Sequence, residues 1–322
     1  MKAYVYGANG AAIADVAKPA PKGTQVLIRV HACGLNRADL GMTKGHAHGS
    51  AGGAGTVLGM EWAGEVAEIG PQASGVRVGD KVMGSGGAAF AEYTLADHGR
   101  LFRTPSNMNF EEACTLPIAL STMHNAVVTN GGLQPGQSVM IQGASSGVGL
   151  MAMQIAKLKG AKFVVGSSTD AARRDRLKEF GADLAVDSSD PGWVDQVLQA
   201  TGGEGVDLIV DQVSGKVASQ NLKATKVKGR VVNVGRLGGT HADFNFDLHA
   251  ARRITYIGVT FRTRSIEEIR EIFDEVRKNI WPAVESRKLQ LPIDKVFAFD
   301  DIGKAFERME ANQHLGKIVV TL

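Results

Sequence analysis

Cysteine is scarce in this sequence: Cys33 and Cys114 are the only two among 322 residues, and no CxxC pair occurs. This scarcity argues against a disulfide framework and a four-cysteine structural zinc site. No apolar run reaches the length needed to span a bilayer, and the N-terminus lacks the apolar region of a signal peptide. We therefore expect a cytoplasmic chain that does not enter a membrane.

An excess of charge is also lacking, since 36 Lys and Arg face 33 Asp and Glu, a formal net charge of +3. The basic residues are spread along the chain, so we expect neither a nucleic-acid surface nor a membrane surface. Prolines number nine and aromatic residues make up 6%, whereas glycines number 40. So many glycines indicate tight turns and close backbone approaches. The partner we expect is a small molecule.

The chain is long enough for two cores, and its pattern changes twice along its length. Residues 1–114 are predicted to be mostly β, with glycine-rich turns between short strands. Helices and strands then alternate to about residue 262, which predicts a doubly wound parallel sheet and hence an α/β chain. The closing strand, 316–322, is predicted to rejoin the first domain. The predicted domains are 1–114 with 282–322, and 115–281.

The second domain is predicted to contain repeated βα units. Two predicted helices, one just before this domain and one inside it, start with the spacing of a capping box: Asn109 with Glu112 and Ser265 with Glu268. The predicted strands are Val139–Gln142, Phe163–Gly166, Leu184–Val186, Val206–Asp211, Gly229–Val234 and Ile254–Thr260.

The stretch Met140–Ser168 predicts one βαβ unit built around a glycine-rich turn. An apolar strand enters the turn, a helical apolar stripe leaves it, and a second apolar strand follows. Gly147-x-Gly149-x-x-Ala152 has the spacing of a dinucleotide fingerprint, in which small residues let the backbone approach a pyrophosphate. An ordinary turn is the alternative. The residues predicted to bind the cofactor here are Gly143, Ser145, Ser146, Gly147, Val148 and Gly149.

The end of the second strand in this unit distinguishes the two nicotinamide cofactors. An NAD enzyme has Asp or Glu there for the ribose 2′-hydroxyl, whereas this chain has Gly166, Ser167 and Ser168. Arg173 and Arg174 follow, and hydroxyls with a guanidinium suit a 2′-phosphate. We predict that Ser167, Ser168, Arg173 and Arg174 bind NADPH. The alternative is NADH, with the two arginines on a solvated helix face.

Seven motifs, in order along nearly the whole chain, resemble the medium-chain dehydrogenase/reductase superfamily and, within it, the zinc-independent quinone oxidoreductases and enoyl reductases. The motifs are CGLNRAD (33–39), LGMEWAG (58–64), VRVGDKVMG (76–84), the glycine turn (143–149), ATGGEGVD (200–207), GRVVNVG (229–235) and GKIVV (316–320). The resemblance implies a GroES-like, mostly-β catalytic domain that is interrupted by a Rossmann domain, with the cofactor in the cleft between them.

The resemblance also shows which residues this chain lacks. Zinc-dependent members have a cysteine ligand where Asn36 stands and a histidine ligand where Met60 stands. A carboxamide and a thioether do not form the N/S ligand set of catalytic zinc. Cys33 lies three residues from the ligand position and is expected to be a small buried residue. His46 and His48 have no further ligands near them in sequence, so we expect no metal.

Without a Lewis acid, the resemblance implies hydride transfer from NADPH to an already polarised acceptor, a quinone or an α,β-unsaturated carbonyl. By the same resemblance, Asn36 and Ser121 lie near the nicotinamide end of the cofactor, and Asp39 holds its loop by backbone hydrogen bonds. His124 is a candidate proton donor to an enolate, the alternative being an ordinary helix residue. A later strand end is expected to border the cofactor, at Val234, Gly235 and Arg236.

Further expectations come partly from composition and partly from the resemblance. Ser146 replaces a glycine of the family fingerprint, and we expect binding to survive because serine is small. The glycine-rich segment 41–55 is expected to be a surface loop. The apolar segment Arg253–Val259 comes late in the sheet, and relatives pair such edge strands across a two-fold axis, so we expect a homodimer. Two alternatives for function remain, a zinc-free carbonyl or alcohol redox enzyme and an NADPH-binding protein without turnover.

Overall fold

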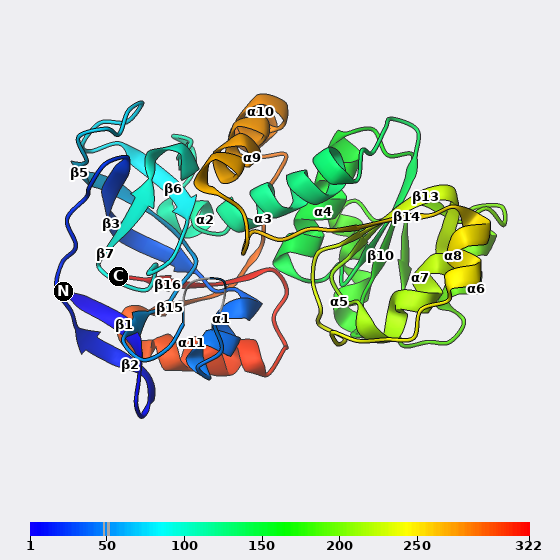
Figure 1. Ribbon diagram of the computed structural model, residues 1–322, viewed down its shortest axis with the longest axis horizontal. Coiled ribbons are helices and arrows are strands. Elements are labelled where there is room, and N and C mark those ends of the chain that lie inside the picture. Colours follow the sequence, from blue (N-terminus) through cyan, green and yellow to red (C-terminus); the bar gives the residue numbers. More distant parts are fainter. Residues whose placement is uncertain (48, 50–51) are drawn as a thin grey trace. The chain divides into compact units, whose positions relative to one another are not determined.

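The structure is a computed structural model that describes residues 1–47, 49 and 52–322, and these residues form two compact units (Figure 1). Unit 1 comprises Met1–Ser121 and Phe261–Leu322, and unit 2 comprises Thr122–Thr260. The chain therefore leaves unit 1 once, forms the whole of unit 2, and returns. In the described part of the chain, no helix combines the length and the apolar character needed to cross a membrane.

Unit 1 is built on two sheets that are mostly antiparallel. Its strands are β1 (Lys2–Gly7), β2 (Gly10–Asp15), β3 (Gln25–Gly34), β4 (Thr56–Val57), β5 (Glu61–Ile69), β6 (Lys81–Ser85), β7 (Tyr93–Asp97), β8 (Leu101–Arg103), β15 (Ile293–Ala298) and β16 (Lys317–Thr321). The smaller sheet has the order β2-β1-β4, and the larger has the order β15-β16-β3-β5-β6-β8, with β7 also paired to β3. The closing strand β16 pairs with β3, so it lies in the larger sheet of unit 1.

The core of unit 1 lies between these strands and the helices around them. Trp62, Phe90 and Leu35 are among its fully buried side chains, and α11 contributes Phe306. The helices are α1 (Arg37–Thr43), η1 (His98–Arg100), α2 (Phe110–Ala113), α3 (Pro117–Met123, which continues into unit 2), α9 (Ile266–Asn279), α10 (Trp281–Glu285), η5 (Phe299–Asp301) and α11 (Ile302–Glu310). Both predicted capping boxes are present, at the starts of α2 and α9.

Helix α9 groups with unit 1, whereas the sequence placed residues 266–281 in the nucleotide-binding domain. Its apolar face packs on this unit, and Phe273 stacks on Phe102 with ring centroids 4.5 Å apart. Arg270 also reaches Asp97 with two hydrogen bonds, from Nε at 2.8 Å and from Nη2 at 2.7 Å. These contacts join segments far apart in the sequence, which a reading of local pattern does not detect.

Unit 2 is a parallel six-stranded sheet with helices on both faces. Its strands are β9 (Ser138–Gln142), β10 (Phe163–Ser167), β11 (Leu184–Val186), β12 (Val206–Asp211), β13 (Thr225–Asn233) and β14 (Thr255–Gly258). Their order is β11-β10-β9-β12-β13-β14, so in sequence order the strands run 3-2-1-4-5-6. Each of the six predicted strands is present, although β13 begins earlier than predicted.

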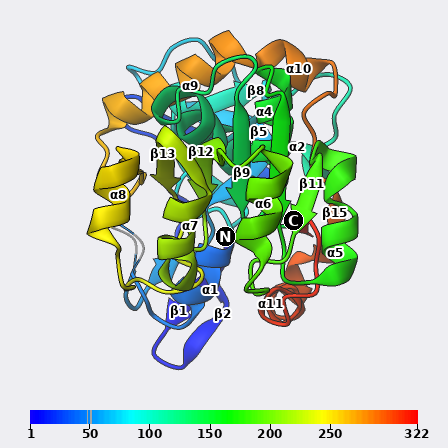
Figure 2. The same cartoon turned by 90° about the vertical axis from the view of Figure 1, so that its right-hand side faces the viewer.

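The helices of unit 2 cover its sheet as a doubly wound fold requires. They are η2 (His124–Asn130), α4 (Gly147–Leu158), α5 (Ala171–Asp175), η3 (Leu177–Phe180), α6 (Trp193–Ala200), η4 (Gly215–Val217), α7 (Ala218–Ala224) and α8 (Phe246–Arg252). Helices α6 and α7 lie in front of the sheet in Figure 2, and α4 lies on its other face (Figure 1). Trp193 of α6 and Leu222 of α7 pack with Met140 of β9 in one buried cluster.

The contact between α9 and β7 predicts a pH-dependent contribution to stability. Burial raises the pKa of Asp97, but hydrogen bonds from Arg270, Thr24 and Gly99 outweigh this and lower the pKa to about 2. Because an unfolded aspartate titrates near pH ~3.9, the ionised carboxylate stabilises the fold fully above that pH, and its contribution is lost as the pH falls towards ~2.

We expect Asp97→Asn to lower the free energy of unfolding by about 2 kcal/mol at neutral pH, because charge-assisted hydrogen bonds are lost. Urea unfolding of the variant and the wild type, compared from pH ~7 down to pH ~3, checks this, and the difference should narrow below pH ~4. Asp274→Asn is the control, since Asp274 pairs with Arg277 on the surface and its side chain is 70% exposed. A difference between Asp97→Asn and wild type that stays constant with pH would contradict the assignment.

Candidate functional site

The glycine turn begins directly after β9, and its two outer glycines are required by geometry. Gly143 has a φ of 72°, in the left-handed region that favours glycine. A Cβ atom on Gly149 would lie 2.6 Å from the carbonyl oxygen of Gly143, so only glycine allows α4 to approach the turn this closely. The predicted strand, turn and helix are therefore present.

Ser146 explains how the turn tolerates the loss of the family glycine. It is the N-cap of α4, and its Oγ accepts a hydrogen bond from Gly149 N at 3.1 Å. The same hydroxyl lies 2.9 Å from Gly143 O and 3.0 Å from Oε1 of Gln212. The first turn of a helix leaves backbone N–H groups, here those of Gly147 and Val148, without partners inside the helix. Together with the helix dipole, these donors favour a bound phosphate.

The two serines after β10 have different surroundings. Ser167 is fully buried: its Oγ accepts a hydrogen bond from Gly143 N at 3.0 Å and donates one to Oε1 of Gln142 at 2.6 Å. Ser167 therefore fixes the start of the turn. Ser168 is also buried, at 5% exposed, but its Oγ donates to Oγ of Ser145 at 3.0 Å, so these two predicted residues meet at the turn.

The two arginines also differ. Arg174 donates from Nη1 to the carbonyl oxygen of Ser168 at 2.9 Å and to Asp187 at 3.1 Å, and it lines a cavity of about 450 Å³. Its side chain thus holds the loop after β10. Arg173 lies on the first turn of α5, where its backbone N–H donates to Asp170 and its Nε lies 3.5 Å from the same carboxylate. Asp170 is the first carboxylate after β10, and it caps α5.

The segment after β13 crosses the end of β12. The backbone N–H groups of Val234 and Gly235 donate to Asp211 O, at 2.7 and 3.1 Å. A Cβ atom on Gly235 would lie 2.5 Å from the carbonyl oxygen of Gln212, which explains the glycine. Arg236 turns back, with its Nη1 donating to Val234 O at 3.2 Å.

Gln212 brings the predicted groups of unit 2 together, and sequence reasoning did not find it. Its Nε2 donates to Gln142 O at 3.2 Å, its Oε1 lies near the hydroxyl of Ser146, and its backbone packs on Gly235. Four other side chains were missed as well: Gln142, Asp211, Ser214 and Asn221. Polar residues at the carboxyl ends of two buried strands, β9 and β12, were the signal available for most of them.

Asn36 lies in unit 1, at the end of β3, and its amide is held by a buried ion pair. Lys317 pairs with Glu61, and their side chains are 6% and 0% exposed. Lys317 Nζ donates to Asn36 Oδ1 at 2.9 Å, whereas Asn36 Nδ2 donates to Glu61 at 3.0 Å and to Gly34 O at 3.3 Å. Burial raises the pKa of Glu61, and Lys317 opposes that rise.

This arrangement fixes which way the amide of Asn36 points. An ammonium group only donates and a carboxylate only accepts, so a flipped amide would face both partners with the wrong atoms. Both amide hydrogens are already donated, so any further hydrogen bond of this side chain is one that Oδ1 accepts. Asn36 can therefore accept a hydrogen bond from a hydroxyl group, but it has no hydrogen left to donate to a carbonyl oxygen.

The remaining predicted residues near the nicotinamide end are Asp39, close to Asn36 in the sequence, and Ser121 and His124, much further along the chain. Oδ2 of Asp39 accepts from Asn36 N at 2.8 Å, which is the expected backbone role, and burial raises the pKa of Asp39 to about 7. The hydroxyl of Ser121 donates to Pro117 O, one turn earlier, at 2.7 Å. His124 is buried and begins the π-helix η2, a rare element that frequently occurs at functional sites.

The cysteine near Asn36 is buried, as expected. The thiol of Cys33 lies 2.9 Å from Ala89 O, and burial raises its pKa well above the usual range. Across residues 1–47, 49 and 52–322, no group of three His, Cys, Asp or Glu side chains is arranged to hold a metal. His48 lies outside the described residues, whereas His46 is described and belongs to no such group.

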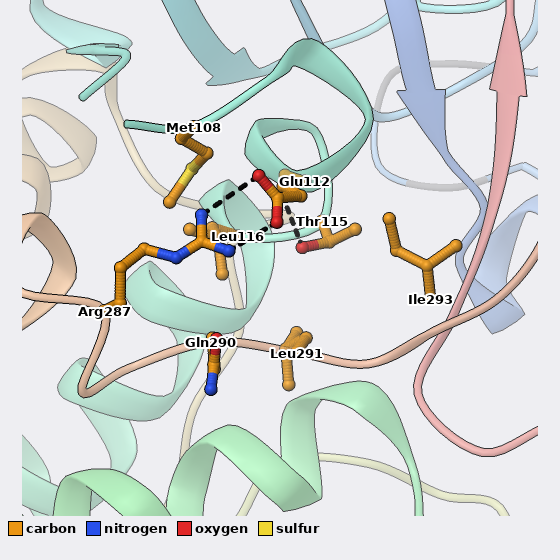
Figure 3. Close-up of a pocket in the computed structure, with 8 residues that line it drawn as sticks. All are labelled: Met108, Glu112, Thr115, Leu116, Arg287, Gln290, Leu291 and Ile293. Carbon is orange, nitrogen blue, oxygen red and sulfur yellow. Dashed lines mark hydrogen bonds and ion pairs between the residues drawn. The ribbon is translucent and has the colours of Figure 1, made fainter. Parts of the chain in front are cut away.

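Unit 1 also has a cavity of about 250 Å³ (Figure 3). Arg287 crosses it to Glu112, donating from Nη1 to Oε2 at 3.0 Å. The other lining residues are Met108, Thr115, Leu116, Gln290, Leu291 and Ile293. None of the predicted site residues is among them.

Comparison with known proteins supports the two-part organisation. Residues 22–106 match the alcohol dehydrogenase GroES-like domain, and residues 147–278 match the zinc-binding dehydrogenase family. A solved alcohol dehydrogenase superfamily protein from Novosphingobium aromaticivorans is 30% identical, covering 100% of this chain and 99% of that one, with a TM-score of 0.90. The CurK enoyl reductase is 25% identical over 99% of both chains, with a TM-score of 0.87.

Curated relatives are of two kinds. Human quinone oxidoreductase is 28% identical over 96% of this chain and 92% of its own length. A phenolphthiocerol/phthiocerol polyketide synthase from Mycobacterium tuberculosis is 29% identical over 96% of this chain, which spans only 14% of that much longer protein.

The matches confirm the fold expected from the sequence, a GroES-like domain with a Rossmann-like parallel sheet. They also confirm the relationship to quinone oxidoreductases and enoyl reductases, proteins of a nicotinamide-dependent dehydrogenase family. With a full-length relative at 30% identity, the chain belongs to the medium-chain dehydrogenase/reductase superfamily of oxidoreductases.

Proposed function

We propose that this protein is a zinc-independent, NADPH-dependent reductase that transfers hydride to a quinone or to an α,β-unsaturated carbonyl compound. The observation that carries this proposal is the position of Asn36 and the orientation of its side-chain amide. It stands where zinc-dependent relatives have a cysteine ligand, and the Lys317–Glu61 pair holds its amide as a hydrogen-bond acceptor. A carboxamide held in this way does not supply the thiolate that catalytic zinc sites of this kind use.

The orientation of Asn36 also bears on the substrate. With no hydrogen left to donate, Asn36 does not polarise a substrate carbonyl, so an unactivated ketone would receive no help from this side chain. It is suited to accept a hydrogen bond from a hydroxyl, such as one on the ribose of the cofactor. An acceptor that is electron-poor by itself, a quinone or an enone, fits such a site best. When bound, the nicotinamide supplies the hydride, and the protein orients it.

The cofactor choice rests on the end of β10. No carboxylate is placed there to bind a ribose 2′-hydroxyl, and the first one, Asp170, caps α5. The hydroxyls of Ser168 and Ser145 meet at this point, and Arg173 follows on α5. Hydroxyl groups and a guanidinium suit a 2′-phosphate, so we propose NADPH over NADH.

The direct test is to follow NADPH absorbance with the purified protein as a benzoquinone or a simple enone is added. We expect oxidation with at least one of these acceptors, unchanged after dialysis against a chelator, and no reduction of NADP⁺ by simple alcohols. Loss of activity on chelation would contradict the zinc-independent assignment. Tight NADPH binding without oxidation by either acceptor would support a protein that binds NADPH without turnover.

The two arginines after β10 provide a matched pair for the cofactor assignment. We expect Arg173→Ala to weaken NADPH binding about tenfold to a hundredfold while leaving NADH binding nearly unchanged, because one charge-assisted contact to the 2′-phosphate is lost. Arg174→Ala should affect both cofactors alike, since Arg174 holds the carbonyl of Ser168 and pairs with Asp187. Quenching or enhancement of nucleotide fluorescence gives the dissociation constants. Equal losses for both cofactors in Arg173→Ala would refute the 2′-phosphate contact.

We also propose that the protein is a homodimer joined through β14. This strand is the edge of the parallel sheet, and an aromatic cluster lies beside it. Phe244 contacts Phe246 and Tyr256, at centroid distances of 5.0 and 5.8 Å, and Phe246 is 75% exposed. Sedimentation should give a dimer for the wild type and a monomer for Tyr256→Glu. Val78→Glu, a change at an exposed apolar residue of unit 1, should leave the dimer intact.

A further inference from the structure

A line of hydrogen bonds begins at the glycine turn and runs into the interior of unit 2. Gly143 N donates to Ser167 Oγ at 3.0 Å, and the Ser167 hydroxyl donates to Gln142 Oε1 at 2.6 Å. Gln142 Nε2 then donates to Asn221 Oδ1 at 2.8 Å. All three side chains are fully buried. The turn is thus connected to Asn221 on α7, a helix that carries none of the predicted cofactor residues.

The line continues from α7 to the other side of the predicted cofactor site. Asn221 Nδ2 donates to Asp211 Oδ2 at 2.9 Å, and Asp211 Oδ1 accepts from the backbone N–H groups of Val213 and Ser214, both at 2.8 Å. The Ser214 hydroxyl donates to Gly235 O at 2.6 Å. Gly143 and Gly235, at opposite ends of this line, are both predicted to border the cofactor.

The order of donors and acceptors along the line allows the side-chain amides of Gln142 and Asn221 only one orientation each. The side chains of Ser167, Gln142 and Asn221 each accept from the turn side and donate towards Asp211. The carboxylate of Asp211 ends this part of the line as an acceptor of three donors. A flipped amide at Asn221 would set donor against donor at Gln142 and acceptor against acceptor at Asp211, and a flipped amide at Gln142 would set its oxygen against Oδ1 of Asn221, which is costly for buried groups.

The far end of the line holds a strained backbone. Ser214 has φ 55° and ψ −152°, a region that residues other than glycine rarely adopt. The two backbone donations to Asp211 and the hydroxyl donation to Gly235 keep it there. Strain of this kind persists only where the surroundings over-determine the conformation. Here the over-determination comes from Asp211, which Asn221 holds, and from Asn233, whose amide donates to the Ser214 hydroxyl.

We propose that Asn221, together with Gln142 and Asp211, is a positioning residue for the cofactor. It holds the glycine turn at a fixed distance from the backbone at Ser214 and Gly235, which one hydrogen bond joins, and it does not touch the cofactor itself. This inference rests on the proposed function, because it assumes that both segments bind one nicotinamide dinucleotide. A cofactor that spans both segments binds well only if their separation is already set, since ordering them on binding would reduce affinity.

The chemistry of the Asn221–Asp211 pair permits a swap experiment. Asp211→Asn places an amide against the amide of Asn221 and breaks the line at any pH. Asn221→Asp places a carboxyl group against the carboxylate of Asp211 and breaks the line once the introduced carboxyl is ionised, because its protonated form would still donate. In the double variant, Asn221→Asp with Asp211→Asn, the pair is reversed. The new aspartate accepts from Gln142 and from the new asparagine, whose Oδ1 still accepts from Val213 and Ser214. Every hydrogen bond is restored.

The measurement is the dissociation constant of NADPH and of NADH, from nucleotide fluorescence, for the wild type, both single variants and the double variant, with melting temperatures in parallel. We expect each single variant to bind at least about tenfold more weakly and the double variant to return to within about threefold of the wild type. Lys223→Ala, an exposed change on the same helix, is the control and should bind as the wild type does.

The outcomes separate this inference from the proposed function. If the wild type binds a nicotinamide dinucleotide and the single variants bind it equally well, whatever their melting temperatures, Asn221 is merely structural and the inference is wrong. If the double variant stays as weak as the single variants, the hydrogen-bond line is not what positions the cofactor, and the inference is again wrong. If the wild type binds neither cofactor, the proposed function fails and the inference with it.

Discussion

The reversal of strand order at β9 is the constraint on which the site in unit 2 depends. The neighbours of β9 are β10 on one side and β12 on the other. In parallel sheets of this kind, the loops at such a point diverge and leave a crevice at the carboxyl ends of the strands, where ligands bind. The last residues of β9 and β12 therefore lie side by side at this point of the sheet. Here they are Gln142 and Asp211, and both are polar and buried.

Burying these polar groups costs free energy unless each has hydrogen-bond partners, and the same hydrogen bonds hold the segments of the proposed site in place. Gln142 and Asp211 do not bond each other through their side chains. Asn221 of α7 lies between them and completes the donors and acceptors of both. A buried network that is fully satisfied has one arrangement, so the backbone segments attached to it are held in one arrangement as well. This is the physical link that we propose between the packing of α7 and the geometry of the predicted cofactor site.

In unit 1, buried charged groups rather than buried amides hold a neighbouring side chain in one orientation. A lysine and a glutamate as deeply buried as Lys317 and Glu61 are retained only when paired and hydrogen-bonded. Their remaining hydrogen-bonding capacity is directed to Asn36 and, on the other oxygen of Glu61, to the backbone N–H of Ile118. The ion pair thereby fixes the one polar group that stands in the position of a family zinc ligand. Under the proposed function, the fixed orientation of this amide limits which reactions the site assists.

Sequence reasoning reached the fold and the glycine turn because both depend on local patterns. The strands of unit 2 are short apolar runs, and the turn needs glycine where φ is positive or where two backbones approach. The local pattern did not distinguish Ser167 from Ser168. In the structure, Ser167 accepts a hydrogen bond from the start of the glycine turn, whereas Ser168 donates one to Ser145. The difference lies in the direction in which each side chain points at the end of β10. Side chains alternate between the two faces of a strand, but the face that each one takes is known only once the register of the sheet is known.

Asn221 shows where local reasoning ends. It is separated from Gln142 by 79 positions and sits on a short helix among residues with no distinctive spacing. Nothing in the neighbouring sequence marks it as more than a helix residue. Its role exists only because the parallel order brings the ends of β9 and β12 together and α7 packs against that junction. Residues that bind a cofactor through backbone turns leave a signature in the sequence, whereas residues that set the distance between two such turns become visible only in the folded chain.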